Sequence, residues 1–469
     1  MDVILPWRWR SLPLDQKTGS EVFAALFRSS DAIATLLESP YLESADGSLA
    51  NYSMCAGAPR GVAEKPQMWT PEVGEILPFL QQLLDRPNLE QFDLAPASLP
   101  FQGGWLGWLG YDLAWEIERL PTLKSDSLPF PIAYWYEPAC FAVLDHQQQI
   151  LWLAATEVSQ LDQMQEKLAS VADQESPVLT EMALKPVAFH LSQTDYESAI
   201  LRAKKHIQAG DIFQANLSLR FETQTFANSW SIYQALQQIN PSPFASYWQT
   251  PWGAVISCSP ERLVKLQGTH AETRPIAGTY ARGMNPAQDR QFAQDLLNNA
   301  KEQAEHIMLV DLARNDLGRV CEWGSVRVDE LLTIERYSHV LHLVSNLVGT
   351  LNSQYTAVDL IRALFPGGTI TGCPKVRCLE IIEALEPDRR SLFYGSCGYL
   401  DLRGNLDLNI LIRTLLYAPQ ADGTNIVWGQ VGAGIVADSD PEREWHESLH
   451  KAQAQLAALK LATSSEDRV

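Results

Sequence analysis

The stretch Arg274–Gly283, which reads RPIAGTYARG, decides how the rest of the chain is interpreted. Pro275 fixes one backbone angle and removes a hydrogen-bond donor. Gly278 permits a turn or a close approach of the backbone to a ligand. Two arginines, Arg274 and Arg282, flank the segment with positive charge. Taken alone, these features predict a loop or strand end beside an anion.

Four further motifs lie on either side of this stretch. They are SPER at Ser259–Arg262, AEHIMLVDLARNDLGRV at Ala304–Val320, PGGTITGCPKVR at Pro366–Arg377 and GQVGAGIVADSD at Gly429–Asp440. In this order, the motifs resemble those of the chorismate-utilising enzymes, which include anthranilate synthase component I, aminodeoxychorismate synthase component I and the isochorismate synthases. The resemblance covers roughly the whole chain and is densest from about Gln193 onward.

The length of the chain bears on its domain organisation. At 469 residues, it exceeds the size of one simple core, so two packed subdomains are expected. The resemblance implies an N-terminal subdomain over residues 1–180 and a chorismate-binding catalytic domain over residues 190–462. The boundary between them is predicted at Ser176–Lys185.

Charge and cysteine content exclude several classes of protein. A net charge of -20 argues against nucleic-acid binding, which uses a basic surface. The seven cysteines are scattered without a CxxC motif, which indicates reduced thiols in a cytoplasmic protein. The N-terminus does not resemble a signal peptide, and no apolar run of about 18 residues predicts a membrane span.

The periodicity of apolar residues predicts a mixed fold. Helical spacing indicates helices over Val22–Leu37, Asp195–Ala209 and Asp289–Leu317, whereas Ile212–Phe221 and Leu406–Thr414 alternate as strands do. This order is neither a βαβ repeat nor all-helical, so it predicts an α+β fold with large, mostly antiparallel sheets. The resemblance implies that two such sheets pack as a sandwich with helices outside, and that the active site lies in a cleft between them.

The SPER motif places a carboxylate, Glu261, after a predicted strand and beside a proline turn. A carboxylate in such a place can be a general acid or base if its pKa is raised. It can equally be a surface side chain paired with Arg262. The resemblance favours the first interpretation and implies that Glu261 is the acid that protonates the leaving hydroxyl.

Two predicted helices carry paired carboxylates. Glu302 and Glu305 share one helix face, and Glu444 and Glu447 share a face of a helix that Pro441 starts. Glu447 lies opposite an apolar stripe, so it faces either solvent or the cleft. Carboxylates from separate helices suit magnesium, which keeps positions open for waters and substrate oxygens. The resemblance implies that Glu305 and Glu447 are the Mg²⁺ ligands, with the metal clamping the ring carboxylate of the substrate.

Substrate anions require their own binding groups. PGGTITGCPKVR lacks the GK[ST] ending of a phosphate loop, so nucleotide binding is rejected, but a glycine turn before a helix still offers N–H groups to an anion. Arg413 can form a bidentate pair with a carboxylate. Chorismate is a dicarboxylate, and the resemblance implies a substrate-binding set of Thr371, Lys375, Tyr399, Arg413, Gly432 and Gly434.

Three more residues are implied to be catalytic. His342 in HVLHLV matches the family's active-site histidine, although its apolar neighbours also suit a core histidine. Gln214 occupies the position at which isochorismate-type relatives carry a lysine that activates water, and a neutral Gln cannot act as that base. Gln214 therefore indicates ammonia, rather than water, as nucleophile. Thr279, which supplies a hydroxyl, joins the catalytic set through the resemblance.

The product depends on features that disagree. Many aminodeoxychorismate synthases carry a nucleophilic lysine where this chain has Ala277, and anthranilate synthases carry Ala. The segments FQGG at Phe101–Gly104, LGYD at Leu109–Asp112, PGG at Pro366–Gly368 and GSCGYL at Gly395–Leu400 resemble aminodeoxychorismate synthase more closely. We expect aminodeoxychorismate synthase component I, with anthranilate synthase component I as the alternative. A non-catalytic tryptophan or chorismate sensor is the alternative of another class.

Two segments resemble the tryptophan pocket of both enzymes, LLES at Leu36–Ser39 and NPSPF at Asn240–Phe244. Each is also compatible with a helix end or an ordinary Asn-Pro turn. The residues that the resemblance assigns to this pocket are Leu37, Glu38, Ser39, Tyr52, Ser53, Asn240, Pro241, Pro243 and Phe244.

The chain shows no glutaminase motif, because no Cys lies in a nucleophile-elbow context with a downstream His-x-Glu. A separate glutamine amidotransferase subunit is therefore expected to supply ammonia.

Overall fold

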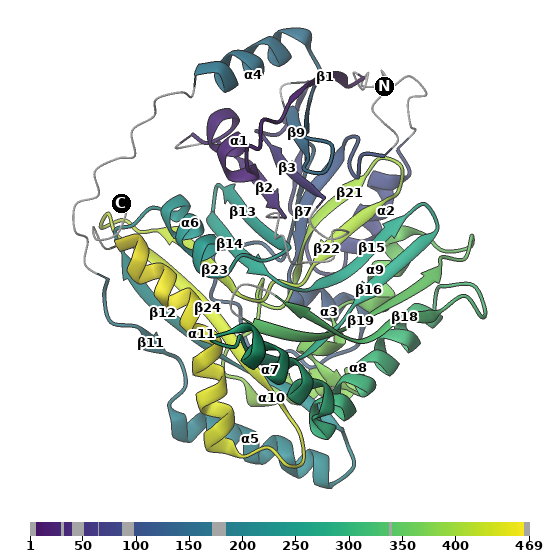
Figure 1. Ribbon diagram of the computed structural model, residues 1–469, viewed down its shortest axis with the longest axis vertical. Helices are drawn as coiled ribbons and strands as arrows, with labels where there is room; N and C mark the ends of the chain where they lie inside the picture. The colour runs from purple at the N-terminus through teal and green to yellow at the C-terminus, as the bar shows by residue number, and fades with distance from the viewer. Residues whose placement is uncertain are drawn as a thin grey trace.

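The computed structural model describes residues 6–29, 32–39, 51–63, 65–86, 98–170, 184–336 and 340–463. Two large sheets, one of 12 and one of 10 strands among these residues, form the body of the molecule, and helices lie outside them (Figure 1). Every strand pair recorded in the two sheets is antiparallel. The predicted α+β class with large antiparallel sheets is confirmed.

The first sheet mixes strands from the two ends of the chain. In spatial order it contains β1 (Arg8–Pro13), β10 (Ile150–Ala155), β9 (Cys140–Asp145), β3 (Tyr52–Ala56), β2 (Ala34–Glu38), β13 (Phe244–Thr250), β14 (Gly253–Ser259), β23 (Thr414–Pro419), β24 (Asn425–Ile435), β12 (Gln214–Thr225) and β11 (Ala188–Phe189), and β20 (Gly372–Cys373) pairs with β12.

The second sheet is mixed in the same way. Its order is β17 (Ile276–Ala281), β19 (Val340–Thr350), β16 (His270–Arg274), β15 (Arg262–Gln267), β22 (Leu406–Asn409), β21 (Ser396–Asp401), β7 (Gly104–Leu109), β8 (Ala133–Tyr136) and β6 (Met68–Trp69), with β18 (Arg327–Arg336) beside β19. A small hairpin joins β4 (Gly61–Val62) and β5 (Lys65–Pro66).

Both sheets contain strands from the ranges 1–180 and 190–462, so these ranges are interleaved in space. The predicted boundary between them falls largely outside the described residues. The largest hydrophobic cluster likewise combines the two ranges, with fully buried Trp105, Trp108 and Trp135 packed in the same cluster as Trp248. The structure therefore has one shared interior between the sheets.

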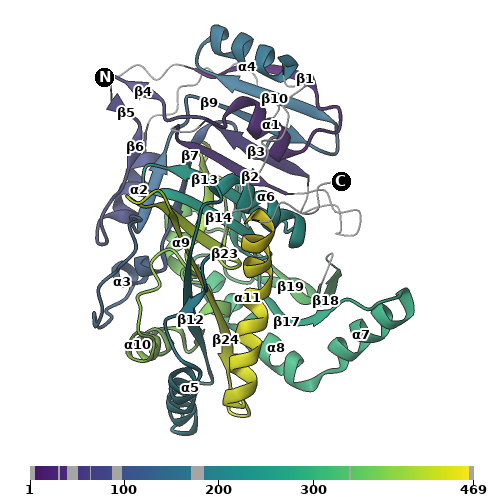
Figure 2. The ribbon, with the colours of Figure 1, turned by 90° about the vertical axis from the view of Figure 1, so that its left-hand side faces the viewer.

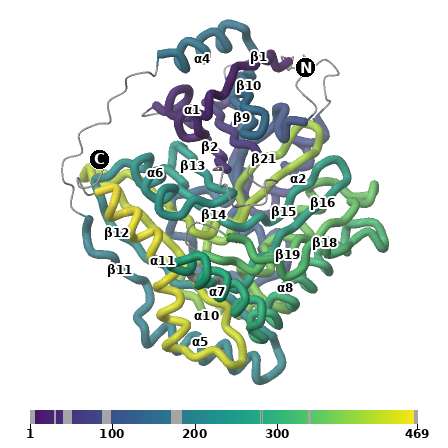
Figure 3. Tube along the Cα trace, viewed as in Figure 1, coloured from purple at the N-terminus to yellow at the C-terminus, as the bar shows by residue number. Residues whose placement is uncertain are grey.

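The helices cover the outside of the sheets. They are α1 (Gly19–Leu26), α2 (Ile76–Leu84), α3 (Ala114–Ile117), α4 (Val158–Ser170), α5 (Gln193–Gln208), α6 (Ser229–Ile239), α7 (Pro286–Asn298), α8 (Ala300–Gly318), α9 (Ala357–Leu364), α10 (Lys375–Leu385) and α11 (Pro441–Thr463), with short 3-10 turns η1 (Tyr111–Leu113) and η3 (Gly368–Ile370). Helix α11 lies along β24 (Figure 2) and reaches from α5 at one end to α6 at the other (Figure 3). Within the described ranges, no helix is long and apolar enough to cross a bilayer.

Several predicted elements need correction. The helix predicted over Val22–Leu37 ends at Leu26, and Ala34–Glu38 is strand β2, because this apolar segment is buried between β3 and β13. The helix predicted over Asp289–Leu317 is two helices, α7 and α8. The chain breaks at Asn299, whose side chain accepts hydrogen bonds from Lys301 N and Glu302 N and so caps α8.

The strand predicted over Leu406–Thr414 is also divided. The chain leaves the second sheet after Asn409 and enters the first sheet at Thr414. Arg413, which precedes the new strand, has a positive φ of 52°. Asp407 and Arg413, which one alternating strand over Leu406–Thr414 would place on the same face, therefore serve different parts of the molecule.

A buried arginine joins β12 of the first sheet to the segments that follow β7 and precede β21. Arg390 donates to the Glu386 carboxylate, to Ile370 O at 2.7 Å and to Asn216 O of β12 at 2.7 Å. Its guanidinium also lies 4.7 Å from the ring centroid of Tyr111 and 4.6 Å from that of Tyr394. Both members of the ion pair are almost inaccessible to solvent, so each depends on the other for its charge compensation.

We predict that Arg390→Met lowers the free energy of unfolding by about 3–5 kcal/mol, because it leaves the Glu386 carboxylate buried without its partner. Urea unfolding followed by circular dichroism measures this loss. The matched control is Arg314→Met, which removes an exposed ion pair with Asp311 and should change stability by less than about 1 kcal/mol. A loss below about 1 kcal/mol for Arg390→Met would contradict the assigned importance of the buried pair.

Candidate active site

The predicted catalytic residues gather where β12 and β24 of the first sheet meet α8, the edge strand β17 and its neighbour β19. Gln214, the first residue of β12, donates from Nε2 to Glu305 Oε1 on α8 at 2.8 Å. Gly434 on β24 lies against the same pair, since a Cβ there would stand 2.4 Å from Gln214 Nε2 and 3.1 Å from Glu305 Oε1. The absence of a side chain at Gly434 therefore keeps the space beside this pair open.

A second glycine on β24, Gly432, opens the neighbouring space. A Cβ at this position would lie 3.0 Å from Asn216 Oδ1 and 3.0 Å from Tyr394 OH. The carbonyl of Gly432 accepts a hydrogen bond from Lys451 Nζ of α11 at 3.0 Å. Gly432 and Gly434 thus form one wall of a space, called the cradle below, whose other walls are the polar side chains of Gln214, Glu305, Asn216 and Tyr394.

Arg413 supplies a positive charge to this cradle. Its guanidinium donates to the carbonyl of Lys451, and no carboxylate in the described part of the chain forms an ion pair with it. Burial lowers the pKa of Arg413, although the neighbouring Tyr394 opposes this effect. A buried guanidinium that lacks an acidic partner is suited to bind a carboxylate from a ligand.

Several buried polar atoms around the cradle have no hydrogen-bond partner among the described residues. They are Gln214 Oε1, Asn216 Oδ1 and Tyr394 OH. Each unpaired buried polar group costs about 1–3 kcal/mol. Their concentration around one space indicates a polar ligand that supplies the missing hydrogen bonds.

Glu261 lies between β14 and β15 and lines a narrow crevice with Thr369, Gly367 and Gly368. Its Oε1 accepts a hydrogen bond from Ile276 N at 3.3 Å. Burial raises the pKa of Glu261 to about 8, and the Thr369 hydroxyl and this backbone N–H only partly oppose the shift. The carboxyl group is therefore protonated at neutral pH and can donate a proton.

His342 on β19 lies close to the segment Arg274–Gly283, which contains β17. Its backbone pairs with Thr279 of β17, and a bulge between Ala277 and Thr279 gives Gly278 a φ of +70°. Burial, reinforced by the nearby Arg413, lowers the pKa of His342 to about 3, so the imidazole is neutral at physiological pH. The side chain of Thr279 lies outside what the structure describes, and only its backbone position is assigned.

Carboxylates from α8 and α11 face the same region. Burial raises the pKa of Glu302, Glu305 and Glu444, and mutual repulsion of neighbouring acids adds to each shift. Glu447 is half-exposed and pairs with Lys451 at 2.8 Å, and this ammonium holds its pKa below the usual value against the effect of burial. These four carboxylates lie close enough to influence one another, and the lysines that oppose their repulsion are Lys301 and Lys451.

Carboxylate oxygens such as these are ligands that suit a hard divalent cation, for example magnesium. Within the described ranges, no three His, Cys, Asp or Glu side chains form a cluster that would hold a metal by themselves. Magnesium commonly takes only one or two protein carboxylates and completes its coordination with waters and substrate oxygens. Glu305 and Glu447 are consistent with such a site, and their roles as ligands remain a prediction.

Three predicted substrate-binding residues lie elsewhere or have other partners. Tyr399 lines a separate cavity, described below, because it is on β21 of the second sheet. Lys375 pairs with Asp316 at 2.7 Å and donates to Leu364 O at 2.9 Å, so its ammonium is already occupied. The hydroxyl of Thr371 donates to Gly367 O at 2.8 Å and stabilises the glycine loop.

The structure adds residues that the sequence analysis missed. Tyr394, five positions before Tyr399, is the tyrosine of the cradle, and Asn216 and Lys451 complete its polar walls. Lys451 could have been found from sequence, because it follows Glu447 by four residues on one helix face. Tyr394 gave no such signal, since its place depends on the buried Arg390 beneath its ring.

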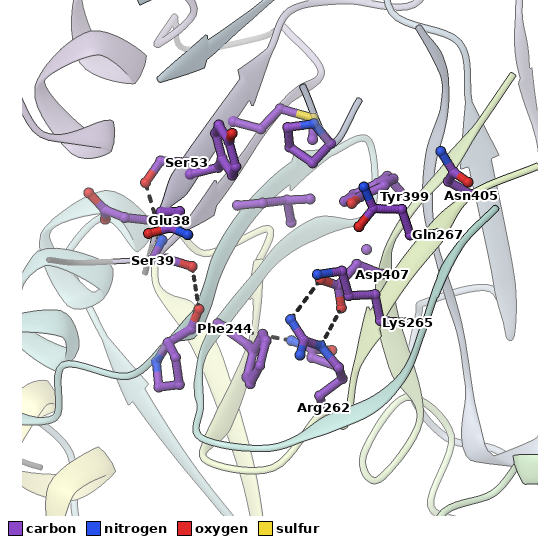
Figure 4. Close-up of a pocket in the computed structure, with 18 of the residues that line it drawn as sticks. Glu38, Ser39, Ser53, Phe244, Arg262, Lys265, Gln267, Tyr399, Asn405 and Asp407 are labelled. Carbon is purple, nitrogen blue, oxygen red and sulfur yellow. Dashed lines mark hydrogen bonds and ion pairs between the residues drawn. The ribbon is translucent and has the colours of Figure 1, made fainter. Parts of the chain in front are cut away.

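The tryptophan-pocket segments border a separate cavity of about 340 Å³ between the two sheets (Figure 4). Seven of the nine predicted residues line it, namely Leu37, Glu38, Ser39, Tyr52, Ser53, Pro243 and Phe244. Asn240 and Pro241 do not line it, because the Asn240 side chain turns toward Ser242 and Cys258 O.

The polar groups of this cavity are partly committed to the fold. Glu38 accepts hydrogen bonds from Ser20 N, Ser20 Oγ and Tyr233 OH, and Ser39 Oγ donates to Pro243 O. Burial raises the pKa of Glu38 despite these contacts. Glu38 therefore contributes structure to the wall as well as polarity.

Comparison with known proteins places this chain among characterised relatives. It is 61% identical to "Anthranilate synthase component I-like protein" of Synechocystis sp., over 97% of this chain and 92% of that protein. It is 45% identical to aminodeoxychorismate synthase component 1 of Bacillus subtilis, over 77% and 78% of the two chains. It is 39% identical to anthranilate synthase component 1 of Synechocystis sp., over 89% and 90%.

The fold agrees with these relationships. The crystal structure of anthranilate synthase component I from Streptococcus pneumoniae superposes with a TM-score of 0.71 at 27% identity, and covers 97% of this chain and 93% of that one. The family described as chorismate binding enzyme matches residues 46–457. The protein is therefore a member of the chorismate-binding enzyme family, and within it belongs with the anthranilate synthase and aminodeoxychorismate synthase components.

Proposed function

We propose that this protein is component I of aminodeoxychorismate synthase and converts chorismate and ammonia to 4-amino-4-deoxychorismate. The main observation that supports a reaction on chorismate is the set of groups in and beside the cradle. The cradle joins an arginine without a carboxylate partner in the described chain and unpaired polar atoms, and a buried, protonated glutamate lines the crevice at Thr369, which Asn216 of the cradle contacts. A dicarboxylate that must lose a hydroxyl group requires these functions.

Relationships among the relatives support this product. Synechocystis has a protein named anthranilate synthase component 1 that is 39% identical to this chain, and a different protein that is 61% identical. The greater similarity to the second protein suggests a role other than the dedicated anthranilate synthase. The 45% identity to the aminodeoxychorismate synthase component 1 of Bacillus subtilis supports the same assignment.

Anthranilate synthase component I remains the second candidate because of Ala277. This alanine is buried on β17 opposite Leu343 of β19, and its methyl group cannot form a covalent adduct with the substrate. The chain therefore aminates without a lysine nucleophile in either case. The two reactions differ in the ring carbon that receives the amino group and in whether pyruvate is then eliminated.

The chain's own groups account for the first part of the reaction. Glu261, protonated at neutral pH, donates its proton to the leaving hydroxyl, which departs as water. Ammonia supplies the new C–N bond, and the proton that it loses restores Glu261. Arg413 orients a substrate carboxylate, and neutral His342 borders the reacting ring without adding charge.

Gln214 explains the choice of nucleophile. Its amide is held by Glu305 and cannot take a proton from water, so water is not activated at this position. Ammonia needs no such activation, because it is already a nucleophile when uncharged. A separate glutamine amidotransferase subunit is proposed to supply it.

Magnesium is proposed between Glu305 and Glu447, near Glu302 and Glu444. Bound there, it would supply the positive charge that holds the ring carboxylate of chorismate. The separate cavity of about 340 Å³ is proposed to hold tryptophan, either as a structural ligand or as an inhibitor.

We expect Glu261→Gln to bind chorismate as the wild type does but to lose about 100-fold or more in kcat, since it removes the proton donor and keeps the shape of the side chain. For the wild type, kcat should fall as pH rises through about 8, where the acid ionises. Steady-state kinetics across pH 6–10 (roughly two units on either side of the acid's pKa) measure both effects. A variant with wild-type kcat would remove Glu261 from the mechanism.

Glu305→Gln and Glu447→Gln should each reduce turnover by about 100-fold or more while the protein stays folded, because each removes a charged oxygen ligand. Binding of Mn²⁺, followed by electron paramagnetic resonance, should weaken in parallel. The control is Asp311→Asn, an acid on the exposed side of α8 that pairs with Arg314. Unchanged Mn²⁺ affinity in both glutamine variants would refute the assigned ligands.

The wild-type enzyme should convert chorismate rapidly with an ammonium salt and magnesium and be idle when ammonia is omitted. Chromatography should show a new product. When the lyase that makes 4-aminobenzoate is added, this product should be converted to 4-aminobenzoate. Direct formation of anthranilate and pyruvate would establish the second candidate instead. Efficient formation of isochorismate or salicylate without ammonia would refute amination altogether.

A further inference from the structure

One charged network connects the cavity wall with the segment that carries Glu261. Arg262, the next residue, binds both oxygens of Asp407, through Nε at 2.9 Å and through the terminal nitrogen at 3.0 Å. Its other terminal nitrogen donates to Glu272 Oε1 at 2.5 Å. The guanidinium also lies 4.9 Å from the ring centroid of Phe244, and Figure 4 shows this arrangement. All sides of the guanidinium are therefore held.

The partners of Arg262 come from three different strands or loops. Glu272 is on β16, Asp407 is on β22, and Phe244 begins β13 of the other sheet. The Arg262 side chain is only 5% exposed, so its ion pairs are shielded from solvent. Such a fixed, bidentate arrangement locks the backbone at Arg262 against rotation and translation.

The backbone of Glu261 needs this restraint because the strand is irregular there. The register of β15 shifts between Arg262 and Val264 against β22, and it also shifts against β16. The carbonyl of Glu261 accepts from Ile410 N at 3.0 Å, and its N–H donates to Ser259 Oγ at 3.3 Å. Arg262 pairs with Asn409 of β22 on the near side of the bulge, and regular pairing with β22 continues from Val264.

We propose that Arg262 is the positioning residue of the general acid, because its guanidinium fixes the bulged segment and thereby aims the Glu261 carboxyl at the leaving hydroxyl. This inference rests on the acid role of Glu261 proposed above. Arg262 acts through its neighbour, since its own guanidinium is occupied by Asp407, Glu272 and Phe244.

The surroundings of Glu261 determine what misplacement would do. The charged side chains that line its crevice are Arg262 and Asp316, and Asp316 is neutralised by Lys375. If the segment loosens, water reaches the Glu261 carboxyl, and its pKa falls from about 8 toward the ordinary value. The alkaline limb of the kcat profile then moves to lower pH.

Two variants of the network test the proposal. Arg262→Lys keeps the positive charge and loses the bidentate fork, and Asp407→Asn keeps Arg262 and its pair with Glu272. Each should lower kcat by about 10- to 100-fold with little change in KM, the size expected for a displaced catalytic group. Each should also shift the alkaline limb to lower pH. The control is Arg60→Lys, whose arginine is equally buried and paired with Glu137 but is distant from Glu261 in the chain and borders neither cavity.

A double-mutant cycle with Glu261→Gln separates the possible outcomes. If Arg262 acts through Glu261, Arg262→Lys combined with Glu261→Gln should turn over no more slowly than Glu261→Gln alone. Additive losses, or unshifted alkaline limbs in both network variants, would overturn the positioning role and leave the acid assignment intact. If the Arg262→Lys variant does not fold, the same double-mutant cycle can be measured with Asp407→Asn in its place. Wild-type turnover of Glu261→Gln would instead overturn the acid and the proposal that rests on it.

Discussion

The buried pair of Arg390 and Glu386 is the constraint on which the site depends. The arginine joins β12 of the first sheet, the glycine loop at Ile370 and two tyrosine rings, and Glu386 accepts from Ser218 N and Oγ of β12. A buried charge with one partner removed is costly, so this junction admits one arrangement of its neighbours. The position of the Tyr394 ring beside the cradle follows from that arrangement.

The site shows how two requirements are met at the same place. The proposed reaction needs an acid that is neutral and an arginine that is charged. Glu261 and Arg413, which are proposed for these roles, are both buried close to points where the chain passes from one sheet to the other. Glu261 stays protonated because burial disfavours its charged form and raises its pKa. Arg413 stays available because the chain crosses between sheets there, with its φ positive, and brings no carboxylate to it.

Motifs that distinguish the possible products lie mostly in the packing of the second sheet. FQGG and LGYD border β7, and GSCGYL forms β21, which pairs with β7. Gly398 is required there because its φ of +157° and the carbonyl of Asp407 leave no room for a Cβ. These motifs serve the packing of the second sheet, whereas Ala277, at the position where the resemblance implies a nucleophilic lysine in many aminodeoxychorismate synthases, favours the other product. This division explains why sequence resemblance alone left the product open.

The sequence by itself determined the α+β class and the position of a helix such as α5, because these depend on local periodicity. The resemblance of its short motifs named Gln214, Glu261, Glu305, His342 and Arg413 as candidate site residues. It could not determine which strands become neighbours, since β2 pairs with β13 across about two hundred residues of chain. Only the tertiary structure separated Tyr399 from the cradle, brought Tyr394 into it and occupied Lys375 with Asp316. Those outcomes depend on burial and on partners distant in sequence, which no local pattern contains.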